Sequence, residues 1–261
     1  LVGLGKLIWP LVAEDSTLRF WLLGALLSLV PISATFANDR LLVFVGIGAA
    51  GALACLFTHT LQSPPGRWAR RAIGALVVVH LVLAPLSMPV RAVSTMFMQS
   101  VLLKTDATIP RAPSVADKSL VVVQGLSDGL ISYALLFRAF QQEPRPRNFR
   151  LLSSGDRETR VTRVDAQTLH MSPRGGFYAT EIEQMVRDPH LPFAVGDTVT
   201  LSNMSVTVTH IDEMGRAMEA DFRFSSPLER PEWLWTMWRE GPLIPWTPPP
   251  VGETVTLPPV W

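Results

Sequence analysis

The stretch RLLVFVGIGAAGALACLF, Arg40 to Phe57, is compatible with two very different structures. Its glycines, Gly46, Gly48 and Gly51, match the G-x-G-x-x-G pattern that binds a dinucleotide pyrophosphate where a strand turns into a helix. The residues after Arg40 also form one uncharged apolar run, as a helix that crosses a bilayer does. The choice between these structures decides whether the chain is a soluble enzyme or a membrane protein.

The residues around the glycines favour the membrane helix. A dinucleotide site needs an acidic residue about 20 positions further on, and that part of the chain reads PPGRWARR, without an acid. A bilayer span needs about 20 mostly apolar residues, and residues 41–58 and 18–36 both come close to this length. Small residues four apart, such as Gly48 and Ala52, let helices approach closely in lipid. We therefore predict membrane helices and no bound cofactor.

The distribution of charge divides the chain into two parts. Of the 261 residues, 48% are hydrophobic and 17% are charged, whereas soluble domains average about 25% charged. No Asp or Glu occurs between Asp39 and Asp106, and most acidic residues follow Asp106. This predicts lipid around the first part and water around the second. The net charge of +1 gives no reason to expect a nucleic-acid partner.

A third apolar run contains two prolines and two ionisable residues. Because proline removes a backbone donor and kinks a helix, we predict a third span over residues 72–100, bent near Pro85 and Pro89. The alternative is a helix that ends near Pro85, with the following residues along the membrane surface. His80 and Arg91 are the candidate polar site in the membrane, since ionisable groups there are costly and often functional. The simpler interpretation is that His80 bonds a neighbouring helix and Arg91 extends to the interface.

The orientation follows from the basic loop between the second and third runs. Arg67, Arg70 and Arg71 lie there without an acid, and short basic loops stay in the cytoplasm. We therefore predict a protein of the bacterial inner membrane whose C-terminal domain lies outside the cytoplasm. Its predicted partners are the lipid bilayer and other membrane helices, upstream or in a partner subunit. The first residue is Leu, which leads us to expect the C-terminal fragment of a longer protein.

The second half has the pattern of a small α+β domain. The segments LVVVQG, LISYALLFRAFQQE and FRLLSS predict a strand, a helix and a strand, hence one βαβ unit. Later segments alternate with period two between turns such as Arg174-Gly175-Gly176, which predicts antiparallel strands. The predicted fold class is a membrane α-helical bundle of about three spans, followed by a small, mostly antiparallel α+β domain. The predicted boundaries are 1–104 for the membrane region, 105–118 for a linker and 119–230 for the domain.

The remaining residues, 231–261, are rich in tryptophan and proline. Their proline content predicts an extended tail without regular structure. Trp233, Trp235 and Trp238 either dip into the membrane interface or pack within the domain.

One motif of the second half has a catalytic form. Gly125-Leu126-Ser127-Asp128-Gly129 lies between a predicted strand and a predicted helix, and resembles the nucleophile elbow of the α/β-hydrolase family. The resemblance implies Ser127 as nucleophile, with an acid and a histidine further along the chain. The acid could be Asp165, Asp188 or Asp197 and the histidine His190 or His210, of which we select Asp197 and His210. The simpler interpretation is a loop in which Ser127 or Asp128 caps the helix. His170, His190 and His210 lack the paired spacing of zinc ligands, so no metal site is predicted.

Three functions are compatible with these observations. The first is a non-enzymatic interaction or scaffolding domain anchored by the membrane helices, which we favour. The second is a membrane-tethered serine hydrolase that uses Ser127. The third is a transporter or lipid-handling bundle with His80 and Arg91 in its pathway, to which the domain is an accessory.

Overall fold

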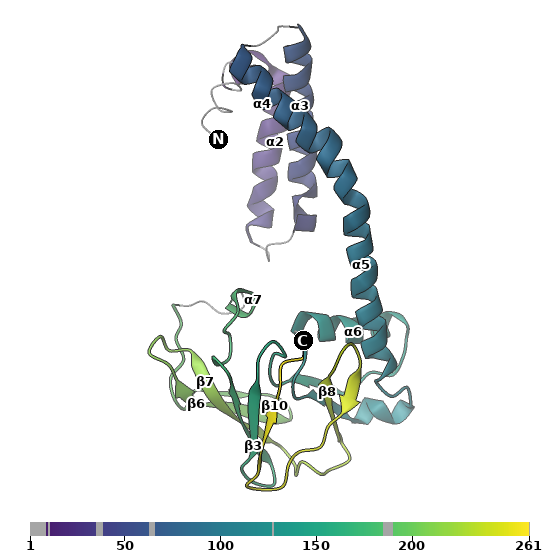
Figure 1. Cartoon of the computed structure of the whole chain (residues 1–261), viewed down its shortest axis with the longest axis vertical. Helices are drawn as coiled ribbons and strands as arrows, with labels where there is room; N and C mark the ends of the chain where they lie inside the picture. The colour runs from purple at the N-terminus through teal and green to yellow at the C-terminus, as the bar shows by residue number, and fades with distance from the viewer. Residues whose placement is uncertain are drawn as a thin grey trace. The chain divides into compact units, whose positions relative to one another are not determined.

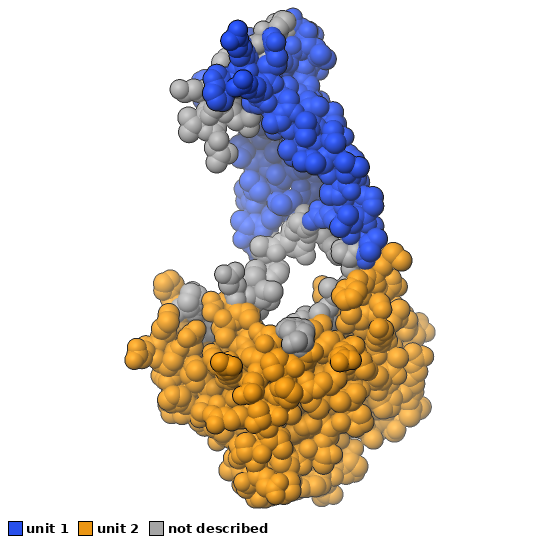
Figure 2. All heavy atoms as spheres, viewed as in Figure 1, with its two compact units in different colours: residues 1–93 blue, residues 94–261 orange. Residues whose placement is uncertain are grey.

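The computed structural model describes residues 9, 11–34, 39–62, 66–126, 128–184 and 190–260. The chain divides into two compact units, Leu1–Val93 and Ser94–Trp261, shown in blue and orange in Figure 2. The described part of the first unit is helical, and the second unit contains both β-sheets (Figure 1).

The helices of the first unit follow the apolar runs of the sequence. Helix α2 begins after Asp15, whose carboxylate accepts hydrogen bonds from the backbone N–H groups of Thr17 and Leu18 at 2.8 and 3.2 Å. The helical elements are α2 (Ser16–Ile32), the 3-10 helix η1 (Asp39–Leu42), α3 (Val43–Gln62), α4 (Arg67–Val77), the π-helix η2 (Val78–Leu83) and α5 (Ala84–Ala107), the last of which continues into the second unit.

Two helical segments are long and apolar enough to cross a membrane. They are Val43–Gln62 and Arg67–Val93. In the most apolar 18-residue stretch of each segment, only 11% and 0% of the residues are buried. The core helix of a soluble protein is mostly buried, whereas a lipid-facing helix leaves its apolar side chains outside the fold. The predicted span 18–36 overlaps α2, which has 17 residues, and residues 35–36 lie outside the described ranges. Two candidate spans are therefore present in the described residues, and the third predicted span is not confirmed.

The three glycines of the opening stretch lie inside α3. A Cβ added to Gly48 would lie 2.8 Å from both the Ala25 Cβ and the Trp21 carbonyl oxygen of α2, and one added to Gly51 would overlap the Trp21 indole. Nothing lies within 4 Å of the same atom on Gly46. The pattern is therefore not a strand-to-helix phosphate loop. The prediction that small residues allow a close helix contact is confirmed for Gly48 and Gly51.

The third apolar helix passes through its prolines without ending. The π-helix η2 lies just before Pro85, and the residue that follows it, Ala84, donates its N–H to the Val79 carbonyl. Because a proline ring collides with the carbonyl four residues earlier, the wider π turn provides the room that a regular turn lacks. The helical stretch then includes Pro89 and runs to Ala107. The alternative in which the helix ends near Pro85 is therefore wrong.

The smaller sheet of the second unit contains the predicted βαβ unit. Strands β1 (Ser119–Val122) and β2 (Asn148–Leu151) are parallel and are joined by α6 (Asp128–Phe140). Strand β8 (Trp233–Trp238) lies parallel to β1 on its other side, and β9 (Leu243–Pro245) is antiparallel to β8. The order is β2-β1-β8-β9.

The larger sheet is antiparallel throughout and has the order β10-β3-β4-β7-β6-β5. The alternating segments of the sequence form its strands, which confirms the mostly antiparallel character of the domain. The strands are β3 (Thr159–Arg163), β4 (Thr168–Pro173), β5 (Thr198–Thr200), β6 (Met204–Ile211), β7 (Ala217–Phe224) and β10 (Thr254–Leu257), and the short helices are η3 (Pro113–Asp117) and α7 (Glu181–Gln184).

The last 31 residues differ from the predicted extended tail, because they provide β8, β9 and β10. Strand β8 contains no proline, and Pro245 ends β9 at the edge of its sheet, where a missing N–H is tolerated. Trp233, Trp235 and Trp238 are buried, so they pack within the domain and not in the membrane interface. Phe224 of β7 contacts both Trp233 and Trp235 edge-on, which joins the two sheets in one core.

The predicted linker 105–118 is also part of the domain. Thr105, Asp106, Ile109 and Val115 are all buried, and the two apolar residues belong to a core cluster with β1 and β9. The composition of this segment is that of a loop, but its apolar residues fix it against the sheet. The domain therefore begins inside α5.

The α2–α3 contact leads to a test with a matched control. Gly48→Leu and Gly51→Leu should each lower the thermal stability of the helical unit in detergent by about 1–3 kcal/mol, because the new side chain collides with α2. Gly46→Leu should not lower it, since that position is open. Thermal unfolding followed by far-ultraviolet circular dichroism measures the difference. Equal effects at all three positions would contradict the contact.

Candidate functional site

Helix α6 holds the largest fully buried side chain of the described residues, that of Arg138, which is 0% exposed. Ala134, one turn earlier on the same helix face, is equally buried. The inner face of α6 therefore carries a small residue that allows close packing and a charge that must be paired within the protein.

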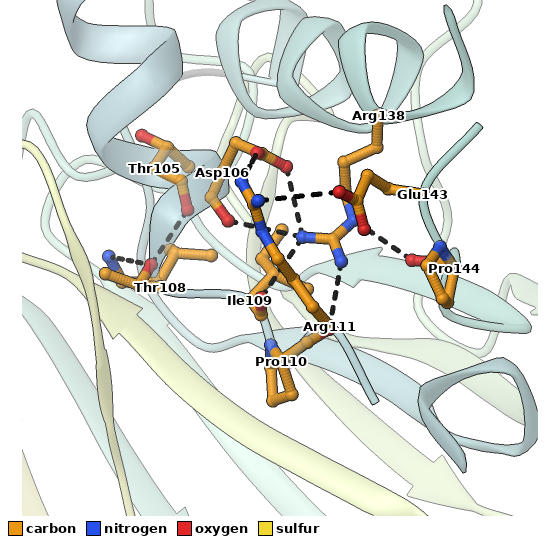
Figure 3. A network of polar contacts seen from close by, with 10 residues as sticks. Thr105, Asp106, Thr108, Ile109, Pro110, Arg111, Arg138, Glu143 and Pro144 are labelled. Carbon is orange, nitrogen blue, oxygen red and sulfur yellow. Dashed lines mark hydrogen bonds and ion pairs between the residues drawn. The ribbon is translucent and has the colours of Figure 1, made fainter. Parts of the chain in front are cut away.

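The Arg138 guanidinium is paired with five acceptors (Figure 3). Nη1 donates to the Asp106 Oδ1 at 3.1 Å, to the Asp106 carbonyl at 3.2 Å and to the Ile109 carbonyl at 3.1 Å. Nη2 donates to the Pro110 carbonyl at 2.9 Å, and Nε to the Pro144 carbonyl at 3.0 Å. A buried charge is tolerated when a counter-ion and hydrogen bonds replace its water, and this site provides both.

The acidic partner, Asp106, lies in the last turn of α5 and is 2% exposed. Its Oδ2 accepts a bond of 3.4 Å from Arg111, which also pairs with Glu143 at 3.4 Å. The preceding residue, Thr105, donates its hydroxyl to the Gly241 carbonyl at 2.8 Å. The end of α5 is thus bonded to α6 and to the connection between β8 and β9, and Arg111 links it to the loop after α6.

The outer face of α6 has the opposite character. Tyr133, Leu136 and Phe140 are 59%, 48% and 78% exposed and lie on the side away from Arg138. A shallow groove of about 740 Å³ runs between α6 and residues 143–147, and Arg145 and Arg147 lie along it. Both arginine side chains are exposed, and neither has a hydrogen bond or ion pair with another residue that the structure describes.

The carboxyl ends of the parallel strands are a second place where α/β proteins bind ligands. Here Gly155 donates its N–H to the Gly125 carbonyl at 2.5 Å, and Val260 donates its N–H to the Gly155 carbonyl at 2.9 Å. A Cβ on Gly155 would lie 2.5 Å from the Val260 side chain. The chain itself therefore fills this edge of the sheet.

A charged cluster lies beside this edge. The Arg157 guanidinium bonds both carboxylate oxygens of Asp156 at 2.7 Å and reaches Glu183 at 2.8 Å. Its Nη1 donates to the Gly176 carbonyl at 2.8 Å. The hydrogen bond from Arg157 holds the pKa of Asp156 below its ordinary value. The cluster joins the loop after β2 to α7.

Of the three candidate residues of the hydrolase interpretation, the structure describes Asp197 and His210. Ser127 is outside the described residues, so neither its nucleophilic role nor its capping role is tested. Asp197 and His210 belong to the β5–β6 hairpin of the larger sheet, and the Asp197 Oδ2 accepts the Ala194 N–H at 2.8 Å. His210 is exposed and lies opposite Glu219 of β7.

The two residues of the predicted membrane site lie on one helical stretch, about three turns apart. The His80 Nδ1 lies 2.9 Å from the Leu76 carbonyl of its own helix. Both His80 and Arg91 are exposed on this stretch. Within the described ranges, no three His, Cys, Asp or Glu side chains converge as metal ligands.

The sequence interpretation missed Arg138 and Asp106. The available signal was a single charge inside the apolar helix LISYALLFRAF, together with the first acid after a run of 66 residues, 40–105, without one. Comparison of the chain with protein-family models, with curated proteins and with solved structures found no match.

The buried pair makes a clear prediction for stability. Arg138→Met leaves the buried Asp106 carboxylate with only the exposed Arg111, at 3.4 Å, as counter-ion, and should lower the free energy of unfolding of the domain by about 3–5 kcal/mol. Arg111→Met removes a half-exposed cation and should cost no more than about 1 kcal/mol. Urea unfolding of the full chain in detergent, followed by tryptophan fluorescence, measures both. Similar losses in the two variants would contradict the assigned role.

The Asp156–Arg157 pair predicts a dependence on pH. Since the pKa of Asp156 is lowered in the folded state, its stabilising contribution is complete above the ordinary value of about 3.9 and is lost as the pH falls through the lower folded value. Asp156→Asn should therefore weaken the loss of stability in acid. Urea midpoints measured from neutral pH down through the ordinary pKa of Asp test this. If the midpoint of the variant falls as steeply with decreasing pH as that of the wild type, the prediction is contradicted.

Proposed function

We propose that this chain is a multi-spanning integral membrane protein whose α+β domain is an interaction module that begins inside the last turns of helix α5. The observation that carries the proposal is the burial of the last turn of α5 in the domain. Asp106 and Thr105 are bonded to α6 and to the β8–β9 connection, so the last turn of α5 belongs to the domain.

The membrane part of the proposal rests on the apolar helices. The segments Val43–Gln62 and Arg67–Val93 have the length and composition of spans, and their apolar side chains face outward. The three predicted spans, the bacterial inner membrane and the extracytoplasmic side of the domain remain part of the proposal. The basic residues Arg67, Arg70 and Arg71, without an acidic neighbour, support a cytoplasmic start for the last helix.

The interaction role is supported by how the domain uses its polar groups. The carboxyl edge of the parallel strands is filled by residues 258–260 of the chain itself, which favours recognition by surfaces over catalysis at that edge.

Cysteine accessibility tests the anchor and the orientation together. In a Cys55→Ala chain, Val251→Cys places a thiol on the domain and Gly66→Cys places one in the basic loop; both positions are exposed. A membrane-impermeant maleimide should label the first in intact cells and the second only after permeabilisation. The protein should also remain in the membrane during alkaline carbonate extraction.

Three results would overturn parts of the proposal. Release of the chain by carbonate would show that it is not anchored in the membrane. Labelling of Val251→Cys only after permeabilisation would show that the orientation is the reverse of the predicted one. If a fluorophosphonate probe labels the wild type but not Ser127→Ala, the domain is a serine hydrolase and the proposed interaction role is wrong.

A further inference from the structure

Helix α6 has the reverse of the usual distribution of polar and apolar residues. A surface helix ordinarily turns its apolar stripe to the core and its charges to water. Here the inner face carries the buried Arg138, and the outer face carries Tyr133, Leu136 and Phe140, which are spaced three and four residues apart. Such a spacing forms one continuous stripe along the helix. An exposed apolar stripe of this kind marks a site of contact with a protein or a membrane.

Helix α5 supports lipid as the surroundings of this stripe, and this step rests on the proposed membrane anchor. Residues 92–103 carry no charge, and the exposed side chains of Met96, Phe97 and Leu103 are apolar. The first charge after this run is Lys104, and Asp106, to which α6 is bonded, follows two residues later, about 3 Å along the helix axis. The candidate span on this helix ends at Val93, and the uncharged run continues from there almost to Asp106, which supports lipid close to α6.

The charges next to the stripe are those that anionic lipid requires. Arg145 and Arg147 are exposed along the groove beside α6. Glu143, the acid among the residues that line the groove, already pairs with Arg111, and Asp106 pairs with Arg138. The surface therefore has a local surplus of positive charge, and guanidinium groups bind phosphate in a bidentate manner. The ring of Tyr133 suits the interface as well, because it combines an apolar body with a polar end.

We propose that α6 and the loop after it form a membrane-docking face. Tyr133, Leu136 and Phe140 enter the interface of the bilayer that α5 leaves, and Arg145 and Arg147 bind the phosphates of anionic lipids. The domain then contacts the membrane through the outer face of α6.

A fluorophore on α6 tests the contact directly. The single native cysteine is replaced in a Cys55→Ala chain, and an NBD label is attached at Leu136→Cys, or at Phe140→Cys as a second position. The chain is placed in nanodiscs of phosphatidylcholine with or without phosphatidylglycerol. The control label is at Val251→Cys, which is exposed in the turn before β10. In anionic discs, doxyl-labelled lipid should quench the α6 labels several-fold more than the control label.

Charge reversal tests the part played by the arginines. The double variant Arg145→Glu/Arg147→Glu should reduce the quenching at Leu136→Cys in anionic discs to the level found in neutral discs. The matched variant Arg160→Glu/Arg174→Glu changes the net charge equally at exposed positions on and beside β3, and should leave the quenching unchanged. Equal effects of the two variants would overturn the assignment of Arg145 and Arg147.

The remaining outcomes separate this proposal from the membrane anchor. Quenching at α6 no greater than at Val251→Cys, in a chain that resists carbonate extraction, overturns the docking face and leaves the anchor intact. A label that is shielded from aqueous iodide but not quenched by doxyl lipid shows that a protein surface, such as a second copy, covers α6, and it too overturns the proposal. Release by carbonate overturns the anchor itself.

Discussion

The ion pair between Arg138 and Asp106 is the constraint on which the arrangement of the second unit depends. A guanidinium that is 0% exposed has lost its water, so each of its donors needs a partner within the protein. The partners come from the end of α5, from the segment after it and from the loop after α6. These three segments cannot separate without exposing or orphaning the charge. The pair therefore fixes where the domain begins relative to α5.

The same pair explains the composition of α6. Its inner face must carry Arg138 and a small neighbour, Ala134, to bring the helix close to the carbonyl groups around Asp106. The apolar residues of the helix are consequently distributed to its flanks and its outer face. In water such a face is unfavourable, whereas beside a bilayer it is a favourable contact. The reversed pattern is thus consistent with a domain that has two surroundings, its own interior on one side and lipid on the other.

The sequence predicted those parts of the fold whose signals are local. The βαβ unit around β1, α6 and β2 follows from two short apolar runs and a helical one, and the antiparallel strands follow from alternation between glycine turns. The segments 105–118 and 231–261 were misjudged because their prolines suggest irregular chain. In the fold, Ile109 and Val115 anchor the first segment, and the prolines of the second lie at the edge or outside the strands. Arg138 and Asp106 are 32 residues apart in the sequence, so no local pattern reveals the pair.

The tryptophans show why a membrane surface is better identified from hydrogen bonds than from residue type. Trp233 and Trp235 are of the residue type that is enriched at membrane interfaces, but their indole N–H groups donate to the Pro227 and Leu228 carbonyls at 3.1 and 2.8 Å. Within the domain, both the apolar ring and the polar N–H group of each indole are already satisfied. Transfer of the indole to lipid would therefore bring no further stabilisation. Phe140 has no polar atom to satisfy and is largely exposed, so it gains most from leaving water. The contrast supports the proposed membrane contact on α6 and leaves the tryptophans to join the two sheets.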